Sequence, residues 1–524
     1  MNTRKKGHKL LIAGVVAATL IAGSSLPYNV MAKNVQTVSI SNVPSYTKYN
    51  LTDPTRFVTD HEVTINGVKI AYQVTAGETY LYNLKGELTA SMFSYSYIKK
   101  GNDSNRPVAF VFNGGPGSSS LWLHMGIIGP RKVVLSNDVN PKVTPPFNIK
   151  DNNNSLLDVA DLVFIDPVGT GYSRAVGVGE NKDFFGIDQD AEAFAQFIDQ
   201  WLTEHGRWNS PKYLVGESYG SVRASILPNA LMGGPTTAGG VFRGISVNGI
   251  ILLGTTLGGT NPDKELETAL SLPSIAATAW YHNKSGFQNM SLEELDKQAF
   301  KFAKEVYHPA IVKEANKQLG SKERKEIVSQ LSKYTGLPEQ SFKDSIAVTS
   351  AAFSKQMLAK EGSHIGLYDS RYTLPSNGDG YEPVADDAAM GQYTPAFTAA
   401  FHQMQKDELK VSMDTPYNSI VWQDLNFAWD TTRKGKIPSQ GYANELSSAM
   451  RRNADLKVFV ASGYYDLVTT PASAKNALDE STVPKDRVFY RNYESGHMLY
   501  IGKTADQFSK DTHRFIENGN VSTE

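Results

Sequence analysis

The most informative segment of the chain is Tyr213-Leu214-Val215-Gly216-Glu217-Ser218-Tyr219-Gly220, in which a short apolar run leads into a G-x-S-x-G pentapeptide. This pattern is typical of a strand that turns sharply into a helix and exposes a nucleophilic serine at the turn. Small residues on both sides of the serine let the chain turn so tightly. Glycine is common here, with 43 in 524 residues, so the pentapeptide alone is a weak indication. Ser218 is a candidate nucleophile that needs support from the rest of the chain.

The surrounding sequence alternates between buried strands and amphipathic helices. The segment before Ser218 has Phe194, Ile198, Trp201 and Leu202 on one helical face. This alternation predicts an α/β fold with a mostly parallel central sheet covered by helices on both faces. The strands are expected at 62–75, 90–97, 107–112, 162–165, 213–215, 250–253, 456–460 and 487–490, and a last helix at 505–517.

The alternation stops between about residues 260 and 430. A capping-box pattern, Ser291-Leu292-Glu293-Glu294, predicts a helix through Val306, and a second helix is expected over 321–334. We therefore expect a mainly helical cap over 260–430, inserted into a core formed by 33–259 and 431–524. An independent second domain is the alternative, but strand patterns on both sides favour one sheet that resumes after the insertion.

The first 32 residues resemble a targeting segment. Four basic residues precede an apolar run over 10–22, and Val30-Met31-Ala32 offers the small residues that a signal peptidase reads. We expect a signal peptide over 1–32 and an exported protein in the medium, at the cell surface or in the periplasm. An uncleaved anchor is the alternative, although the run is shorter than the ~20 residues that span a bilayer. The absence of cysteine excludes disulfides and fits a bacterial exported protein better than a eukaryotic secretory one.

Composition limits the partners. The net charge is −1, which gives no electrostatic reason to expect nucleic acid, or a membrane beyond the signal peptide. The sequence has no cluster of metal ligands and no phosphate-cradling loop followed by lysine, so we predict no metal and no cofactor. The oligomeric state is left open.

Two further residues complete a candidate catalytic set. Asp466 follows the strand at 456–460, and His497 follows the strand at 487–490. Active residues of such folds lie at the carboxyl ends of strands, and the order Ser218, Asp466, His497 is that of the α/β-hydrolase architecture. His497 is expected to move the serine proton, and Asp466 to orient and stabilise the imidazole.

The tetrahedral intermediate also needs N–H donors for its oxyanion. Tyr219 N–H, one residue past the nucleophile, is one candidate. The other is Gly115 N–H, in the glycine-rich loop Asn113-Gly114-Gly115-Pro116-Gly117 after the strand at 107–112. Missing side chains let that backbone approach the oxyanion.

Four motifs resemble those of the serine carboxypeptidases, the peptidase S10 family. This resemblance implies an α/β-hydrolase fold with a cap and the removal of C-terminal residues from peptides or proteins. It also implies that Asn113 and Glu217 hydrogen-bond the terminal carboxylate of the substrate. The motifs are Asn113-Gly114-Gly115-Pro116-Gly117-Ser118-Ser119-Ser120, Gly216-Glu217-Ser218-Tyr219, Gly496-His497-Met498, and Asp166-Pro167-Val168-Gly169-Thr170-Gly171-Tyr172-Ser173, which lacks the family's glutamine.

The chain departs from the family at the carboxylate site. Family members carry a glutamate where this chain has Ile127, and that glutamate shares a proton with the residue corresponding to Glu217. A lone, ionised Glu217 would repel a carboxylate. Arg223, where the family has tyrosine, is expected either to neutralise Glu217 or to bind the carboxylate, with a structural ion pair as the alternative.

The sequence favours an exported serine carboxypeptidase that forms an acyl-enzyme at Ser218. The nearest alternative is an esterase or acyltransferase with the same triad, because fold and triad do not fix the substrate. A non-catalytic binding protein is disfavoured by the intact Ser218, Asp466 and His497.

Overall fold

A computed structural model describes residues 53–101, 103–259, 262–376, 382–433, 435 and 441–521. The expected signal peptide and its cleavage site at Ala32 lie outside these residues. Within the described part of the chain, no helix is both long enough and apolar enough to cross a membrane.

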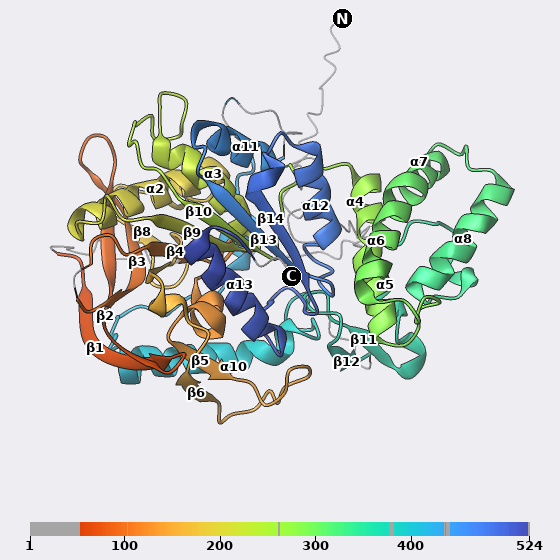
Figure 1. The fold of residues 1–524 in the computed structure, drawn as a ribbon, viewed down its shortest axis with the longest axis horizontal. Helices are drawn as coiled ribbons and strands as arrows, with labels where there is room; N and C mark the ends of the chain where they lie inside the picture. Colours follow the sequence, from red (N-terminus) through yellow and green to blue (C-terminus); the bar gives the residue numbers. More distant parts are fainter. Residues whose placement is uncertain are drawn as a thin grey trace, which may run out of the picture.

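The centre of the molecule is a ten-stranded sheet in the order β1-β2-β3-β7-β4-β9-β10-β13-β14, with β8 paired to β3 (Figure 1). The strands from β7 to β14 run parallel to one another, and β1, β2 and β3 continue the sheet in antiparallel pairs. This confirms the predicted α/β fold. The strands are β1 (Arg56–Ile65), β2 (Val68–Tyr82), β3 (Leu88–Lys99), β4 (Val108–Phe112), β7 (Asp161–Ile165), β8 (Arg174–Ala175), β9 (Lys212–Glu217), β10 (Gly249–Leu253), β13 (Lys457–Gly463) and β14 (Val488–Tyr493), and two small hairpins add β5 (Arg131–Val134) with β6 (Asn148–Asp151) and β11 (Ser363–Ile365) with β12 (Thr373–Pro375).

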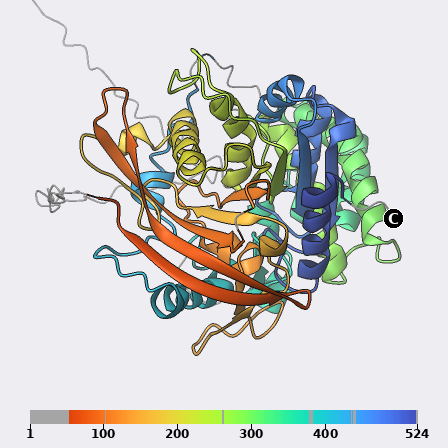
Figure 2. The ribbon, with the colours of Figure 1, turned by 60° about the vertical axis from the view of Figure 1, so that its left-hand side comes forward.

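The first predicted strand, 62–75, is wrong, because it runs through a hairpin. β1 ends at Ile65 and β2 begins at Val68, with Asn66 (φ 51°) and Gly67 (φ 79°) in the turn between them. Asn-Gly with both φ angles positive is the preferred two-residue hairpin turn, so this dipeptide was the missed signal. Figure 2 shows the two strands curving together across one side of the molecule.

Helices pack on both faces of the parallel strands, and alternate strand residues point to opposite faces. Phe110, Leu214 and Leu252 belong to the cluster under α2, α3 and α11, whereas Val111, Val215 and Leu253 belong to the cluster with α1, α10 and α13. The predicted helix with the Phe194 face is confirmed as α2. The helices are α1 (Leu121–Leu123), α2 (Ile187–Glu204), α3 (Tyr219–Met232), α4 (Lys264–Leu270), α5 (Leu272–Tyr281), α6 (Leu292–Phe302), α7 (His308–Ala315), α8 (Ser321–Thr335), α9 (Ser350–Gln356), α10 (Met390–Gln403), α11 (Ala443–Arg452), α12 (Pro471–Glu480) and α13 (Thr504–Asn518).

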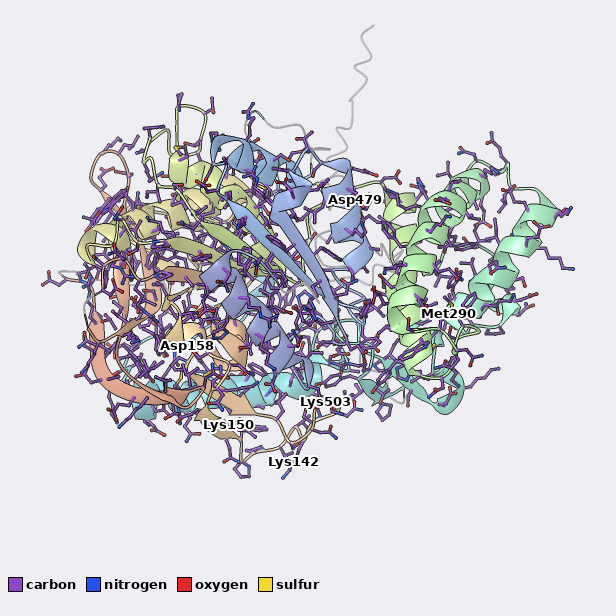
Figure 3. All side chains as sticks on the ribbon, in the orientation of Figure 1. Lys142, Lys150, Asp158, Met290, Asp479 and Lys503 are labelled. Carbon is purple, nitrogen blue, oxygen red and sulfur yellow. The ribbon has the colours of Figure 1, made fainter. Side chains whose placement is uncertain are left out.

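The inserted segment divides into two parts. Helices α4 to α9 share a hydrophobic cluster of their own and form a lobe beside α12, at the right of Figure 1. Figure 3 labels Met290 on this lobe and Asp479 on α12, next to it. By contrast, Tyr393, Phe397 and Phe401 of α10 pack in the core cluster of the sheet. The expected cap over 260–430 is therefore not one body, since α10 belongs to the core.

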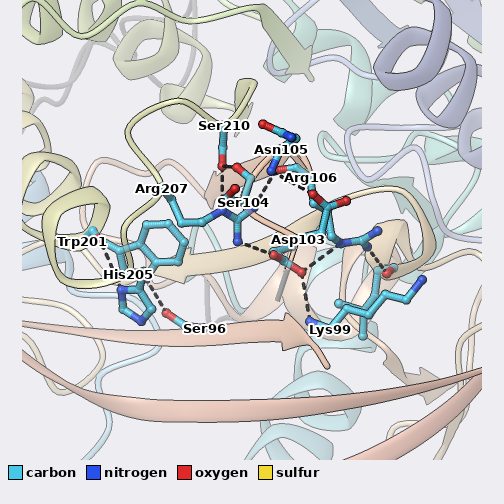
Figure 4. Close-up of polar contacts among 12 residues, drawn as sticks. Ser96, Lys99, Asp103, Ser104, Asn105, Arg106, Trp201, His205, Arg207 and Ser210 are labelled. Carbon is cyan, nitrogen blue, oxygen red and sulfur yellow. Dashed lines mark hydrogen bonds and ion pairs between the residues drawn. The ribbon is translucent and has the colours of Figure 1, made fainter. Parts of the chain in front are cut away.

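A polar cluster holds the strands together at their amino ends. The carboxylate of Asp161, the first residue of β7, accepts hydrogen bonds from Arg106 Nε at 3.0 Å, from Arg207 Nη1 at 2.5 Å and from Lys99 N at 3.0 Å. Arg207 also donates to Ser210 Oγ at 2.6 Å. Figure 4 shows Lys99, Arg106, Arg207 and Ser210 in close-up. Because Asp161 begins β7 and Ser218 follows the end of β9, which runs in the same direction, this cluster lies at the sheet end opposite to Ser218.

Candidate active site

Ser218 occupies the sharp turn between β9 and α3, in a backbone conformation that side chains rarely adopt (φ 60°, ψ −128°). Its N–H donates to Leu253 O of the neighbouring strand at 2.9 Å, which holds the turn in place. The flanking glycines are required by close backbone approaches. A Cβ on Gly216 would lie 2.1 Å from Gly220 O, and one on Gly220 would lie 2.8 Å from Phe112 O. The turn therefore tolerates only glycine at these two positions.

The sheet brings Asp466 and His497 to the same end as Ser218. His497 Nδ1 lies 2.7 Å from Asp466 Oδ2, and both side chains are buried. Asp466 Oδ1 accepts from Val468 N at 2.8 Å and from Thr469 N at 2.9 Å, so its orientation is fixed. Ser218 and His497 line one pocket, and within the described residues their side chains form no hydrogen bond with each other. Catalytic hydrogen bonds are often loose before substrate binds.

Burial and charge act in opposite directions on His497. Burial of the ring opposes protonation, but Asp466, by charge and hydrogen bond, and then Glu217 and Asp387 outweigh it and raise the pKa of His497 above its ordinary 6.5. The imidazolium that forms during proton transfer is therefore stabilised where it is needed. This electrostatic setting suits a general base.

Two backbone N–H groups are available beside the nucleophile. A Cβ on Gly114 would lie 2.3 Å from Tyr219 N, so the glycine-rich loop touches the start of α3. Gly115 has a φ of 104°, a conformation that favours glycine. Neither Gly115 N–H nor Tyr219 N–H donates to an acceptor among the described residues. Both therefore fit the expected oxyanion hole.

The pocket at this site has a mixed wall of polar, aliphatic and aromatic residues. Ser218, His497, Glu217, Asn113 and Gly115 all line it, so the sequence-predicted residues converge there apart from Arg223, Asp466 and Tyr219. Asp466 does not line the pocket but hydrogen-bonds to His497, which does. Tyr219 offers only its backbone N–H at the start of α3. The remaining wall is formed by Gly114, Ser118, Trp122, Tyr368, Met390, Tyr393, Ile420, Trp422, Val468 and Met498.

Glu217 is buried beside Ser218, with 2% of its surface exposed. Its Oε2 accepts hydrogen bonds from Asn113 Nδ2 and, at 2.9 Å, from the Tyr500 hydroxyl, whereas Oε1 has no hydrogen-bond partner among the described residues. Burial raises the pKa of Glu217 to about 7, although His497, Tyr500 and Asn113 pull it down. The carboxyl group is thus protonated in a large fraction of molecules near neutral pH.

Arg223 does not have the expected contact with Glu217 or with the pocket, and its position corrects that expectation. The guanidinium is 1% exposed and donates from Nε to Asp190 Oδ2 at 2.7 Å and from Nη1 to Asn113 O at 2.7 Å. It also packs over the Phe194 ring, 4.5 Å from its centre. Arg223 forms no hydrogen bond or ion pair with Glu217 and does not line the pocket. Among the described residues it therefore holds a structural ion pair and anchors the backbone of Asn113.

Two functional candidates were missed by sequence reasoning. Tyr500 lies three residues after His497, and its hydroxyl reaches Glu217. Thr469 lies three residues after Asp466, donates to Asp466 Oδ2 at 2.6 Å and contacts His497 Nδ1 at 3.0 Å. The aspartate followed three residues later by threonine was a usable signal for a local cap. Nothing in the sequence near Tyr500 indicated its partner, 283 residues away.

The Asp166 motif supports the site from the neighbouring strand. Asp166 Oδ1 accepts from both the N–H and the hydroxyl of Ser120, each at 2.8 Å, and so fixes the end of the glycine-rich loop. A Cβ on Gly171 would lie 2.0 Å from Asp166 Oδ2, which explains that glycine. Elsewhere in the described part of the chain, no group of three acidic or histidine side chains is arranged to hold a metal ion.

Comparison with known proteins identifies the family. A family model for serine carboxypeptidase matches residues 72–516. The pheromone-processing carboxypeptidase of Phaeosphaeria nodorum is 28% identical over 148 residues, which is 28% of this chain and 21% of that protein. Serine carboxypeptidase-like 10 of Arabidopsis thaliana is 26% identical over 147 residues, 27% of this chain and 31% of that protein. The match therefore spans less than a third of the length of these relatives.

The fold agrees with a solved structure of the same kind. The prohormone-processing carboxypeptidase from Saccharomyces cerevisiae superposes with a TM-score of 0.51 at 15% identity, covering 86% of this chain and 92% of that one. At this identity the likeness concerns the fold alone, and it confirms the predicted α/β-hydrolase fold. With the family model matching most of its length, this chain belongs to the serine carboxypeptidase family, peptidase S10.

Proposed function

We propose that this protein is a serine carboxypeptidase, which hydrolyses the last peptide bond of peptides or proteins through an acyl-enzyme at Ser218. The observation that carries the proposal is one pocket that holds both a candidate nucleophile with its base and, one residue away, the buried Glu217. An enzyme that only cleaved esters would have no need of a half-protonated carboxyl group beside its nucleophile. Membership of the family supports the same activity.

Substrate binding places the terminal carboxylate against Glu217. In its protonated form Glu217 donates a hydrogen bond to that carboxylate, whereas the ionised form repels it. Burial holds the pKa of Glu217 at about 7, so the protonated form is abundant in mildly acidic solution without a second glutamate. Burial of Glu217 thus keeps the carboxyl group protonated without the second glutamate that Ile127 replaces. Arg223 has no part in this, contrary to the expectation from the sequence.

Acylation begins when His497 takes the Ser218 proton as Oγ bonds to the carbonyl carbon. The N–H groups of Gly115 and Tyr219 stabilise the resulting oxyanion. His497 then gives the proton to the amide nitrogen, the C–N bond breaks, and the C-terminal amino acid leaves. In the second half, His497 takes a proton from water as the water oxygen bonds to the acyl carbon. His497 then gives the proton to Ser218 Oγ, the bond between Oγ and the acyl carbon breaks, and the shortened peptide leaves with a new carboxyl group.

An esterase or acyltransferase remains the second candidate, and Ile127 is the observation that favours it. Ile127 offers no carboxyl group that could share a proton with Glu217, so the proposed carboxylate site has a single glutamate. The two candidates share Ser218, His497 and Asp466 and differ in whether a free terminal carboxylate improves the substrate.

The test is to incubate the protein with a peptide of about ten residues whose C-terminus is free or amidated, and to follow the products by mass spectrometry. We expect successive loss of single C-terminal residues from the free peptide, slow or no trimming of the amide, and neither in Ser218→Ala. Hydrolysis of a simple ester without any trimming of the free peptide would favour the esterase.

We also propose that the protein acts outside the cytoplasm, because 1–32 has the pattern of a cleaved signal peptide. Expression of the full chain in a bacterial host should yield an exported protein that begins at Lys33, which N-terminal sequencing detects. A cell-associated protein that retains Met1 would contradict this.

A further inference from the structure

Tyr500 is the least expected residue at the carboxylate site. It follows the His497 loop, is 1% exposed, and donates its hydroxyl hydrogen to Glu217 Oε2 at 2.9 Å. The ring occupies space that Gly126 leaves open, since a Cβ on Gly126 would lie 2.2 Å from Tyr500 Cε2. The next residue is Ile127, which is fully buried and has no polar group to offer. Tyr500 thus supplies a polar partner that this part of the chain cannot.

The two oxygens of Glu217 have different surroundings. Oε2 accepts one hydrogen bond from Asn113 Nδ2 and one from the Tyr500 hydroxyl. The Asn113 amide nitrogen can act only as a donor. The Tyr500 hydroxyl has no other acceptor among the described residues, so a proton on Oε2 would leave the phenolic hydrogen unpaired. Oε1 has no partner of any kind in that part of the chain. A proton bound to Glu217 is therefore held on Oε1.

The charged groups around Glu217 do not change which of its two oxygens carries the proton. His497 favours the ionised carboxylate, and Asp466 from the neighbouring loop disfavours it. Tyr393 of α10 faces the same carboxyl group as a neutral phenol. None of these three residues donates a hydrogen bond to Oε1. The hydrogen-bond pattern of Oε2 alone distinguishes the two oxygens.

We propose that Tyr500 is a positioning residue, which acts with Asn113 to fix Oε2 of Glu217 as an acceptor and so presents the carboxylic proton on Oε1 to the terminal carboxylate of the substrate. The proposal rests on the carboxypeptidase function proposed above. Tyr500 touches no reacting atom and works through Glu217. Its effect should therefore concern substrates with a free carboxylate and spare those without one.

The test compares Tyr500→Phe with the parent protein on an N-blocked dipeptide and on its matched ester, from pH 5 to pH 9. Phenylalanine keeps the ring and removes only the hydroxyl. We expect KM for the free dipeptide to rise about tenfold, because one hydrogen bond that orders the carboxyl group is lost. The alkaline fall in kcat/KM should move to higher pH, since the Tyr500 hydrogen bond lowers the pKa of Glu217. The kinetics on the ester should not change.

A second variant and a control separate this role from a merely structural one. Glu217→Gln has an oxygen to accept from Asn113 and Tyr500 and an NH₂ at the Oε1 position, so it should bind the free dipeptide with a KM that no longer rises at alkaline pH. Tyr213→Phe removes another buried hydroxyl, which donates to Ile516 O at 2.9 Å away from the site, and should match the parent protein.

The outcomes distinguish the two proposals. If the parent protein prefers the free dipeptide and Tyr500→Phe shows the same KM and pH profile, the role of Tyr500 is wrong and the proposed function stands. An equal loss on dipeptide and ester would also overturn the positioning role, because it indicates a general disturbance. If the parent protein shows no preference for a free carboxylate, the proposed function fails, and this inference fails with it.

Discussion

Glu217 and His497 line the same pocket, and the proposed mechanism requires each in its neutral form. His497 accepts a proton only when neutral, and its pKa is raised mainly by Asp466 against the effect of burial. Glu217 donates to a carboxylate only when protonated, and burial raises its pKa to about 7. His497 must therefore be deprotonated while Glu217 is protonated, which limits the range of pH for substrates with a free carboxylate.

This predicts different pH profiles for two substrates. For a free N-blocked dipeptide, kcat/KM should rise with pH as His497 deprotonates and fall above about pH 7 as Glu217 ionises, which makes a bell. For the matched ester, the rise should remain and the fall should disappear. Initial rates on both substrates between pH 5 and pH 9 check this. Identical profiles would show that Glu217 does not contact the substrate carboxylate.

Arg223 gives a prediction about stability instead of binding. Arg223→Ala leaves Asp190 buried without its partner, which should lower the free energy of unfolding by about 3–5 kcal/mol in urea titrations. The double variant Asp190→Leu, Arg223→Met should recover part of that loss. On the free dipeptide and the ester, kcat/KM should fall by similar factors. A loss confined to the free dipeptide would mean that Arg223 binds the carboxylate after all.

Single residues were predictable where chemistry and strand position agree. Ser218, Asp466 and His497 each follow a strand, and the sheet order brings the ends of β9, β13 and β14 together. Arg223 was misplaced because a charge on the helix after the nucleophile looks like a ligand group until its buried partner Asp190 is known. Tyr500 could not be predicted, since its contact depends on how distant segments pack.

At the scale of elements, the turn at Ser218 and the glycine-rich loop after β4 act as one unit. The loop approaches so closely that a Cβ on Gly114 would lie 2.3 Å from Tyr219 N and 2.7 Å from Glu217 O. Both are backbone atoms and cannot move aside without shifting β9 or α3. Because Gly114 has no side chain, the loop can approach the turn closely enough to place the two candidate oxyanion donors near each other.

Gly114→Ala should separate the loop from the turn and move Gly115 N–H away from Tyr219 N–H. We expect kcat to fall by about 10²–10³, the usual effect of losing one oxyanion donor, with a smaller change in KM. Gly67→Ala is the matched control, because that glycine has positive φ but open space around it, and should cost only about 1 kcal/mol of stability with kcat unchanged. Unaltered kcat in Gly114→Ala would argue against this oxyanion hole.

Strands that are buried on both faces were predictable from their hydrophobic pattern and composition. The runs that became β4, β7 and β10 are continuously apolar because helices cover them. The 62–75 segment lies at the antiparallel edge, where exposed and more buried residues alternate along both strands. In this segment only the Asn66-Gly67 dipeptide indicates a hairpin turn, because the alternation of residues continues through both strands.

In the whole molecule, the lobe of α4 to α9 has its own hydrophobic cluster and meets the core both at α12 and through the loop segment after α9. Leu467 N donates to Leu367 O at 2.9 Å, and His497 N donates to Tyr368 O at 2.7 Å, so the segment after α9 contacts both catalytic loops. Tyr368 also lines the pocket. Residues 367–368 therefore link the loops of Asp466 and His497 to the lobe side of the insertion, and α10 and residues 420–422 line the same pocket. Periodicity in the sequence does not reveal these links.

A separate cluster should unfold separately. Leu331 on α8 is fully buried in the lobe, and Leu331→Ala should cost about 2–5 kcal/mol. Hydrogen exchange should then accelerate in α5 and α8 while β9 and β10 stay protected. Leu252→Ala, at a fully buried position of the sheet, should instead accelerate exchange in β9 and β10. Uniform acceleration in Leu331→Ala would show that lobe and core form one cooperative unit.

The proposed carboxypeptidase function is tested by kcat/KM at pH 6 for an N-blocked dipeptide with a free C-terminus, compared with its C-terminal amide. We expect the enzyme to prefer the free dipeptide by about 10- to 100-fold, which is the effect of a hydrogen bond to a charged group, and we expect Ser218→Ala to lose about a thousandfold or more on both substrates. Equal rates on the two substrates, or activity retained in Ser218→Ala, would overturn the proposed function.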